Sequence, residues 1–247
     1  AWALTAALKS EPILISRLVQ IAQMAITADA TVYCLRYTVF SENELLELAD
    51  LIASIDPLDD MDVIQVGEMT QFFGEFEHKW FLTHDHTGFL DANRWKTLSM
   101  LALEVEALEL DPLALHARVA ELDAEYSDIP FPLVIAKMYG SGHVLAPQKC
   151  VRILADLGAL HTGLLIECHR RRHGQLPKQL SDLDADLERR LRPDPYSDDL
   201  YRYRPERDRF TVYSIGDNLL DDHGVLQAES ERRRGAYAPP PDRGYTI

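Results

Sequence analysis

The sequence predicts an α+β protein in which an all-helical N-terminal domain precedes a long helix and a small antiparallel β-sheet. Apolar residues recur with helical spacing through most of the first 150 residues, and short alternating stretches typical of strands occur only after residue 199. The charge also changes along the chain. Residues 1–150 carry nine basic and 23 acidic side chains, whereas residues 151–247 carry 16 and 17. We therefore expect an acidic helical domain over 1–150 and an α+β module over 151–247.

The N-terminal helices have recognisable start and stop signals. A first helix is expected from Pro12, after Ser10 and Glu11. Ser41 and Glu44 have the spacing of a capping box, and an apolar stripe follows until Asp56-Pro57. Further helices are expected over about 60–78, 91–109 and 111–125, with interruptions at Tyr126–Pro132 and Gly140–Gly142.

The C-terminal third begins with a strongly apolar helix over 151–168 that is expected to end at Gly174. Its apolar face includes Leu154, Leu157, Leu164 and Leu165, and we expect this face to pack on the strands. Residues Leu200–Arg204 and Arg209–Ser214 alternate like the two strands of a hairpin, with Pro205–Asp208 as its turn.

The net charge and the length of the charge-free stretches limit the classes of partner that the protein can bind. A formal net charge of −15 argues against binding to duplex nucleic acid or to an anionic membrane. Leu18–Ala28, the longest charge-free stretch in the N-terminal helices, is shorter than the roughly 20 apolar residues of a spanning helix. The first residues, Ala1-Trp2, lack an initiator Met, so we expect a fragment whose anchor, if any, lies upstream. Protein partners are expected, with membrane contact only through such a missing N-terminal anchor.

A family resemblance appears in residues 151–224. His173-Gly174-Gln175-Leu176-Pro177 follows the long helix, Asp194-Pro195-Tyr196-Ser197 precedes the hairpin, and Tyr213–Asn218 is followed by Asp221-Asp222. In this order the motifs resemble those of the major, G-like pseudopilins of type II secretion. The whole chain is also similar to large proteins of planctomycete-type bacteria, which join such a module to a helical segment like Glu11–Ala22.

The resemblance implies a pseudopilin-like fold and an extracytoplasmic or periplasmic location, with a secretion- or envelope-associated role. The chain departs from the family because it lacks a prepilin start and carries about 150 residues before the module. We therefore transfer the fold more readily than the role in pilus assembly.

The strongest candidate site is an acidic loop that contains Asp217, Asn218, Asp221 and Asp222 between two glycines. Calcium takes several oxygen ligands, which clustered carboxylates on a turning loop supply. The resemblance to the pseudopilin calcium loop points the same way, so Ca²⁺ is the expected cofactor. A solvated acidic turn is the open alternative.

Other clusters have ordinary explanations. His84-Asp85-His86, with His78 nearby, lacks the further Asp and His of the common hydrolase motif, so a polar loop is favoured. His169 and His173 are one helical turn apart, but three arginines stand between them, which favours a solvated helix end. Asp59, Asp60 and Asp62 fit the first turn of a helix.

No catalytic set is visible in the sequence. We therefore expect a non-catalytic structural or interaction protein. The alternative is a metal-dependent hydrolase with a site between the two domains.

Overall fold

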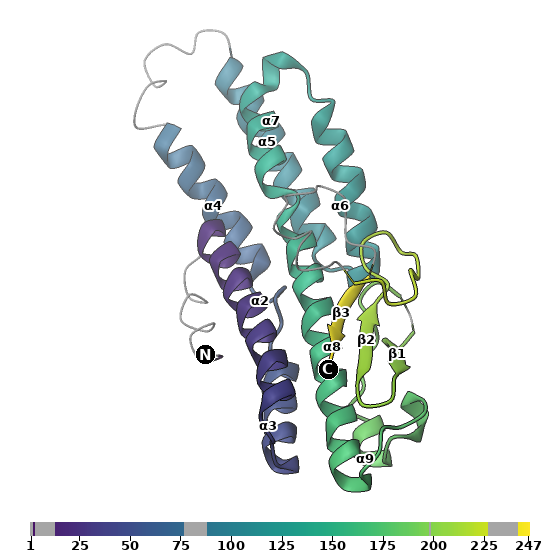
Figure 1. Ribbon diagram of the computed structural model, residues 1–247. Coiled ribbons are helices and arrows are strands. Elements are labelled where there is room, and N and C mark those ends of the chain that lie inside the picture. The colour runs from purple at the N-terminus through teal and green to yellow at the C-terminus, as the bar shows by residue number, and fades with distance from the viewer. Residues whose placement is uncertain (1, 3–12, 77–87, 198, 227–241) are drawn as a thin grey trace. The chain divides into compact units, whose positions relative to one another are not determined.

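The computed structural model describes residues 2, 13–76, 88–197, 199–226 and 242–247, and its fold is α+β, as the sequence predicts (Figure 1). The helices are α2 (Leu14–Tyr37), α3 (Glu42–Ala53), α4 (Met61–Phe76), α5 (Phe89–Ala107), α6 (Pro112–Ser127), α7 (Val134–His143), α8 (Ala146–His173) and α9 (Ala185–Glu188). Short 3-10 turns lie at Phe131–Leu133 and Leu180–Asp182, and the strands are β1 (Arg202–Pro205), β2 (Phe210–Ser214) and β3 (Arg243–Thr246). The expected helix start at Ser10–Pro12 lies outside the described residues.

The chain forms two compact units, each built from separate stretches of sequence. The first contains residues 1–23 and 58–151, and the second contains residues 24–57 and 152–247. Helices α2 and α8 each contribute to both units. The division expected after residue 150 therefore lies inside α8, and residues 24–57 belong to the unit that holds the sheet. The assignment of 1–150 and 151–247 as two domains stays a prediction.

In the first unit, α5, α6 and α7 pack against one another (Figure 1). The segment Gly140–Gly142, which the sequence predicted to interrupt the pattern, lies inside helix α7. A side chain at Gly140 would collide with Met100, and its Cβ would lie 2.7 Å from the ring of Tyr126. Gly140 therefore permits a close approach of three helices, and the prediction of a break there was wrong.

In the second unit, the sheet packs on α8 at two glycines. A side chain at Gly158 would collide with the Tyr201 hydroxyl, and a Cβ at Gly163 would lie 2.7 Å from Ile247. The sequence predicted instead that a leucine face of α8 packs on the strands. Leu164 and Leu165 are fully buried, but residues 157–169 are buried on every side, so burial does not distinguish one face.

The sheet has the order β1-β2-β3 and is antiparallel throughout. The predicted hairpin is confirmed, with Tyr203 opposite Val212 in the register. The sequence did not predict β3, which pairs with the other edge of β2. Gly244 lies so close to the Val212 carbonyl that no side chain fits there, and a four-residue strand containing glycine carries little strand signal.

Candidate metal centre at the end of helix α8

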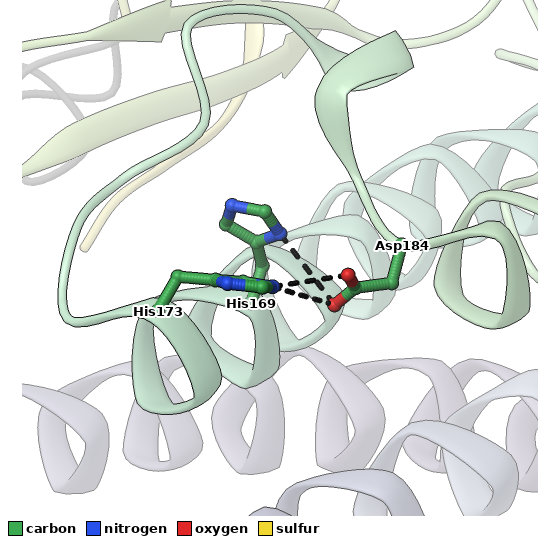
Figure 2. A group of neighbouring side chains, drawn as sticks. All are labelled: His169, His173 and Asp184. Carbon is green, nitrogen blue, oxygen red and sulfur yellow. Dashed lines mark hydrogen bonds and ion pairs between the residues drawn. The ribbon is translucent and has the colours of Figure 1, made fainter.

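Three potential metal ligands meet at the carboxyl end of α8 in the second unit. His169 and His173 lie one turn apart on the helix, and Asp184 reaches them from the residue before α9 (Figure 2). One ligand atom from each residue lies within 4.8 Å of the others. The sequence predicted a solvated helix end for both histidines. That prediction was wrong for His169, which is buried and only 7% exposed, whereas His173 is exposed.

The chain brings Asp184 to the histidines by turning back immediately after the helix. Gly174 has a φ of 71°, the left-handed conformation that ends many helices. The carbonyl of Pro177 accepts a hydrogen bond of 2.8 Å from the Tyr203 hydroxyl, which ties the returning segment to the hairpin. Leu183 is buried beside Asp184. Asp184 occupies the N-cap position of α9 without capping it, so its carboxylate is available to His173.

The contacts within the cluster are uneven. His173 Nε2 lies 3.0 Å from Asp184 Oδ1 and 3.1 Å from Oδ2. His169 Nδ1 lies 3.7 Å from Asp184 Oδ2, beyond hydrogen-bond distance, and this buried nitrogen has no hydrogen-bond partner among the residues that the structure describes. The two rings are neighbours, with centroids 4.4 Å apart. A buried polar atom without a partner is costly and calls for an explanation.

The electrostatics favour the protonation states that bind metals. Burial lowers the pKa of His169, and the neighbouring His173 lowers it further. Hydrogen bonds from His173 and Arg172 lower the pKa of the Asp184 carboxyl, against a smaller opposing effect of burial. A neutral imidazole and an ionised carboxylate are the forms in which these side chains coordinate cations.

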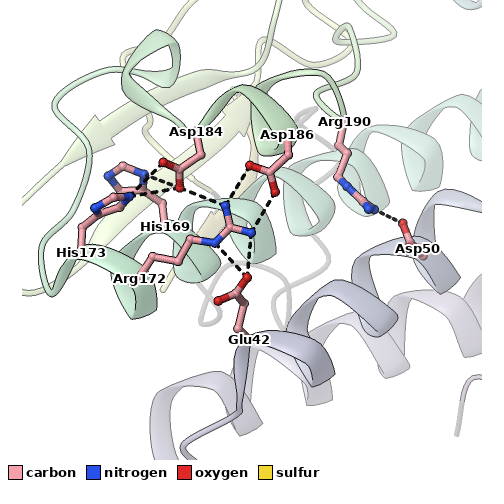
Figure 3. Close-up of polar contacts among 8 residues, drawn as sticks. All are labelled: Glu42, Asp50, His169, Arg172, His173, Asp184, Asp186 and Arg190. Carbon is pink, nitrogen blue, oxygen red and sulfur yellow. Dashed lines mark hydrogen bonds and ion pairs between the residues drawn. The ribbon is translucent and has the colours of Figure 1, made fainter.

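Arg172 forms the centre of an ionic network beside the cluster (Figure 3). Its guanidinium binds Asp186 with two contacts of 2.9 and 2.8 Å and Asp184 with one of 3.1 Å. It also binds Glu42 at the start of α3, at 2.8 Å from Nε and 2.7 Å from Nη2. The hydrogen bonds from Arg172 lower the pKa of Asp186 to about 2. The network thus joins α3, α8 and α9 within the second unit.

The other arginines near the helix end also have acidic neighbours. Arg170 and Arg171 lie 2.6 and 2.9 Å from the buried carboxylate of Glu167, and Arg190 pairs with Asp50 (Figure 3). From the sequence alone, these arginines were expected to repel a cation. Because neighbouring carboxylates reduce the positive charge of these arginines, the arginines are a weaker argument against a metal site.

The side chains of the predicted calcium loop form hydrogen bonds and ion pairs with other side chains of the protein. Asp217 accepts a 2.6 Å bond from Arg152 and another from the Tyr196 hydroxyl. The Asn218 amide donates to Asp222 at 2.9 Å. Asp221 accepts from the Tyr213 hydroxyl at 3.1 Å, and its Oδ2 lies 3.8 Å from Arg202.

The three aspartates of this loop do not have the mutual distances of a metal site in the described part of the chain. Among the described residues, the group of histidine, cysteine and acidic side chains with the mutual distances of a metal site is the one at the end of α8. The sequence also gave no sign of Asp242, which accepts the backbone N–H groups of Asp222 and Gly224 and so fixes the loop. Calcium binding by the loop stays a prediction.

The remaining sequence candidates can be placed briefly. His78 and His84-Asp85-His86 lie outside the described residues. Asp59, Asp60 and Asp62 stand at the start of α4, where the Asp59 carbonyl accepts a hydrogen bond from Arg17.

No family model, curated protein or solved structure matches this chain. The pseudopilin resemblance therefore rests on the motifs alone and stays a prediction.

Proposed function

We propose that this protein is a non-catalytic, extracytoplasmic structural or interaction protein of the bacterial envelope that contacts a membrane surface through helix α2. The observation that carries the proposal is the outward apolar face of that helix. Ile15 and Val19 are exposed in the part that belongs to the first unit. Ile26, Tyr33 and Tyr37 are exposed in the second, Ile26 by 69%.

The opposite face of α2 is buried although it is rich in polar groups. Arg17 and Gln20 are buried and hydrogen-bonded to each other at 2.9 Å. Thr31 is buried and donates to the Thr27 carbonyl at 2.8 Å. Apolar side chains are buried on this side as well, namely those of Leu14, Met24, Ala28, Val32 and Leu35. Helix α2 therefore has apolar residues on both its buried and its exposed sides, whereas an ordinary surface helix turns its apolar residues to the core. A long exposed apolar face marks a surface that binds another apolar surface.

A membrane fits the dimensions of this face. Helix α2 has 24 residues and is therefore about 36 Å long. Among the described residues it is the one helix that is long and apolar enough, by length and composition, to cross a bilayer. The sequence analysis, which counted only charge-free residues, missed this property because Asp29 interrupts an otherwise uncharged stretch over 18–35.

The polar groups on the buried side of α2, such as Arg17 and Gln20, favour a helix that lies on a membrane over one that crosses it. An interfacial helix buries one apolar face about 5–10 Å deep and keeps the other face in a polar environment. The exposed rings of Tyr33 and Tyr37, with centroids 4.7 Å apart, are side chains typical of that depth. Because the net charge is −15, we expect binding to neutral rather than anionic lipid.

Flotation of the protein with phosphatidylcholine vesicles tests this proposal. The parent should rise with the vesicles, and an Ile15→Asn, Ile26→Asn variant should remain in the dense fraction. A Leu220→Asn variant is the matched control, because Leu220 is equally exposed but lies in a loop. A parent that never floats, or a double variant that floats as well as the parent, would contradict the proposal.

The other expectations from the sequence are kept as part of the proposal. The motifs shared with major pseudopilins support an extracytoplasmic, secretion-like setting. Calcium at Asp217, Asn218, Asp221 and Asp222 would stabilise the loop that follows β2.

A metal-dependent hydrolase is the second candidate, and the donor set of His169, His173 and Asp184 favours it. Two histidines and a carboxylate leave one position of a tetrahedral zinc open to water, as in catalytic sites. Hydrolysis of p-nitrophenyl acetate by the zinc-treated protein separates the two candidates. A rate that falls to the background in His173→Ala would favour the hydrolase, whereas equal rates favour the non-catalytic role.

A further inference from the structure

The donor atoms at the end of α8 select for a particular class of metal. Two imidazole nitrogens and one carboxylate oxygen suit zinc and its first-row neighbours. Calcium and magnesium prefer sites built from oxygen atoms alone. The cluster is therefore chemically distinct from the acidic loop at Asp217–Asp222.

The distances are close to those that coordination requires. Zinc bonds of about 2.0–2.1 Å in a tetrahedron place neighbouring ligand atoms roughly 3.3 Å apart. Asp184 Oδ2 lies 3.1 Å from His173 Nε2 and 3.7 Å from His169 Nδ1, values on either side of that target. The two histidines share one helix face, as in other sites with histidines four residues apart. The three ligand atoms all lie within 4.8 Å of one another, so the side chains must move closer together to bind one ion.

The unpartnered nitrogen is the independent observation that points to a ligand. His169 Nδ1 is buried, faces Asp184 (Figure 2) and makes no hydrogen bond. Coordination would satisfy this atom. It would replace the contact between His173 and Asp184 by two bonds to the metal, while the Arg172 bond to Asp184 Oδ2 can remain and orient the carboxylate.

The local charge also favours a divalent cation. Three carboxylates, those of Glu42, Asp184 and Asp186, surround the single guanidinium of Arg172. Two more arginines, Arg170 and Arg171, share one carboxylate, that of Glu167. Their remaining positive charge offsets part of the negative charge around Arg172. The carboxyl end of a helix adds a partial negative charge of its own.

We propose that His169, His173 and Asp184 bind one zinc ion, which fastens the returning segment 174–184 to the end of helix α8. The site is independent of the membrane contact proposed for α2. It lies on other residues, and zinc uptake can be measured without lipid.

Calorimetric titration of the chelator-treated full chain with zinc chloride tests the site. We expect one zinc per chain, and a melting temperature that rises with zinc because the ion binds only the folded cluster. In His173→Ala and in Asp184→Asn the affinity should fall at least tenfold and the rise in melting temperature should disappear. Magnesium chloride should give neither effect.

The control variant is His223→Ala, which removes a histidine that is 90% exposed and outside the cluster. It should bind zinc as the parent does. Because His173 and Asp184 are partly exposed, both ligand variants should fold, which circular dichroism can verify. A parent that takes up no zinc, or ligand variants that bind it as tightly as the parent, would overturn the proposal. Flotation with vesicles would be unaffected by either result.

Discussion

Glu104, in the last turn of α5, has a buried carboxyl group in the first unit. It is 2% exposed, and neither oxygen has a hydrogen-bond partner in the described structure. Burial raises the pKa of Glu104 to about 8, and the neighbouring Tyr126 hydroxyl offsets only part of this effect. The folded protein therefore holds a proton on Glu104 at neutral pH, which the unfolded chain releases.

This carboxyl makes stability depend on pH in a definite direction. Because its pKa is higher in the folded state, its contribution to stability is complete below about pH 4.5 and is lost as the pH rises through about 8. Glu104→Gln should remove this dependence and raise the free energy of unfolding at pH 9 by about 2–4 kcal/mol. Urea denaturation at pH 5, 7 and 9 measures the effect. Glu106→Gln, on the exposed side of the same helix, should follow the parent at every pH.

His161, within α8, has a pKa shift that makes stability depend on pH in the opposite direction. It is 2% exposed, and burial lowers its pKa to about 4, with nearby Arg192 contributing. The folded state keeps the ring neutral, so stability should fall as the pH drops from 6.5 towards 4 and the unfolded chain takes up the proton. The ring proton resonances, assigned by comparison with His161→Gln, should not shift between pH 5 and 8. A titration midpoint near 6.5 would show that the ring is solvated.

Neither residue could be identified from the sequence. Glu104 lies in a helix whose apolar and polar residues are mixed. His161 lies among leucines, but the sequence does not show whether its ring is buried and neutral. Their perturbed pKa values come chiefly from burial, which depends on packing that the sequence does not show. The neighbours that modify these values, Tyr126 for Glu104 and Arg192 for His161, are also distant in sequence.

At the scale of elements, α7 provides a matched pair of glycines. Gly140 faces Met100 and Tyr126, whereas Gly142 has no atom near the position of a Cβ. Gly142→Ala should stabilise the protein by about 0.5–1 kcal/mol, because alanine is the better helix former. Gly140→Ala should destabilise it by about 1–3 kcal/mol through overpacking. Thermal unfolding of both variants checks this. Equal shifts would mean that the helices do not pack as closely as described.

The loop after β2 gives the test of calcium binding. Calcium should raise the melting temperature of the parent but not that of an Asp217→Ala, Asp221→Ala double variant, and magnesium should do less. Because Asp217 is already bonded to Arg152, calcium must compete with this ion pair, and the stabilisation should be modest. If millimolar calcium shifts both proteins equally, the loop is only a solvated acidic turn.

The sequence predicted those elements whose signals are local. Ser41 and Glu44 form the expected capping box, with the Ser41 backbone N–H donating to Glu44 at 2.8 Å. The end of α8 before Gly174 was also predicted. The contact of Asp184 with His173 was not, because a segment of ten residues must fold back to make it. The signal that could have found the cluster was the spacing of His169 and His173, which the arginines between them obscured.

At the scale of the molecule, the fold class followed from pattern and composition, but the assembly of the two units did not. Residues 24–57 join the C-terminal unit because α2 continues from one unit into the other. Helical periodicity along a single chain does not indicate which distant segment a helix will contact. The exposure of Ile15, Ile26 and Tyr33 on α2 could not be predicted for the same reason, since the sequence shows apolar residues without showing which face is buried.

Helix α2 contains an exposed cysteine that can be labelled to test the proposed membrane contact. Cys34 is exposed next to Tyr33, whereas Cys150 and Cys168 are buried. Burial raises the pKa of the Cys168 thiol to about 12, which suppresses the reactive thiolate. A polarity-sensitive fluorophore with a maleimide group should therefore attach to Cys34 alone.

The emission of this fluorophore on Cys34, recorded as phosphatidylcholine vesicles are added, tests the central claim most directly. The proposed membrane contact predicts a saturable shift to shorter wavelength and quenching by brominated lipid. The same probe at position 223, in a Cys34→Ser, His223→Cys variant, should change little. Emission from Cys34 that stays unchanged at saturating lipid, in a protein that remains folded, would contradict the role assigned to α2.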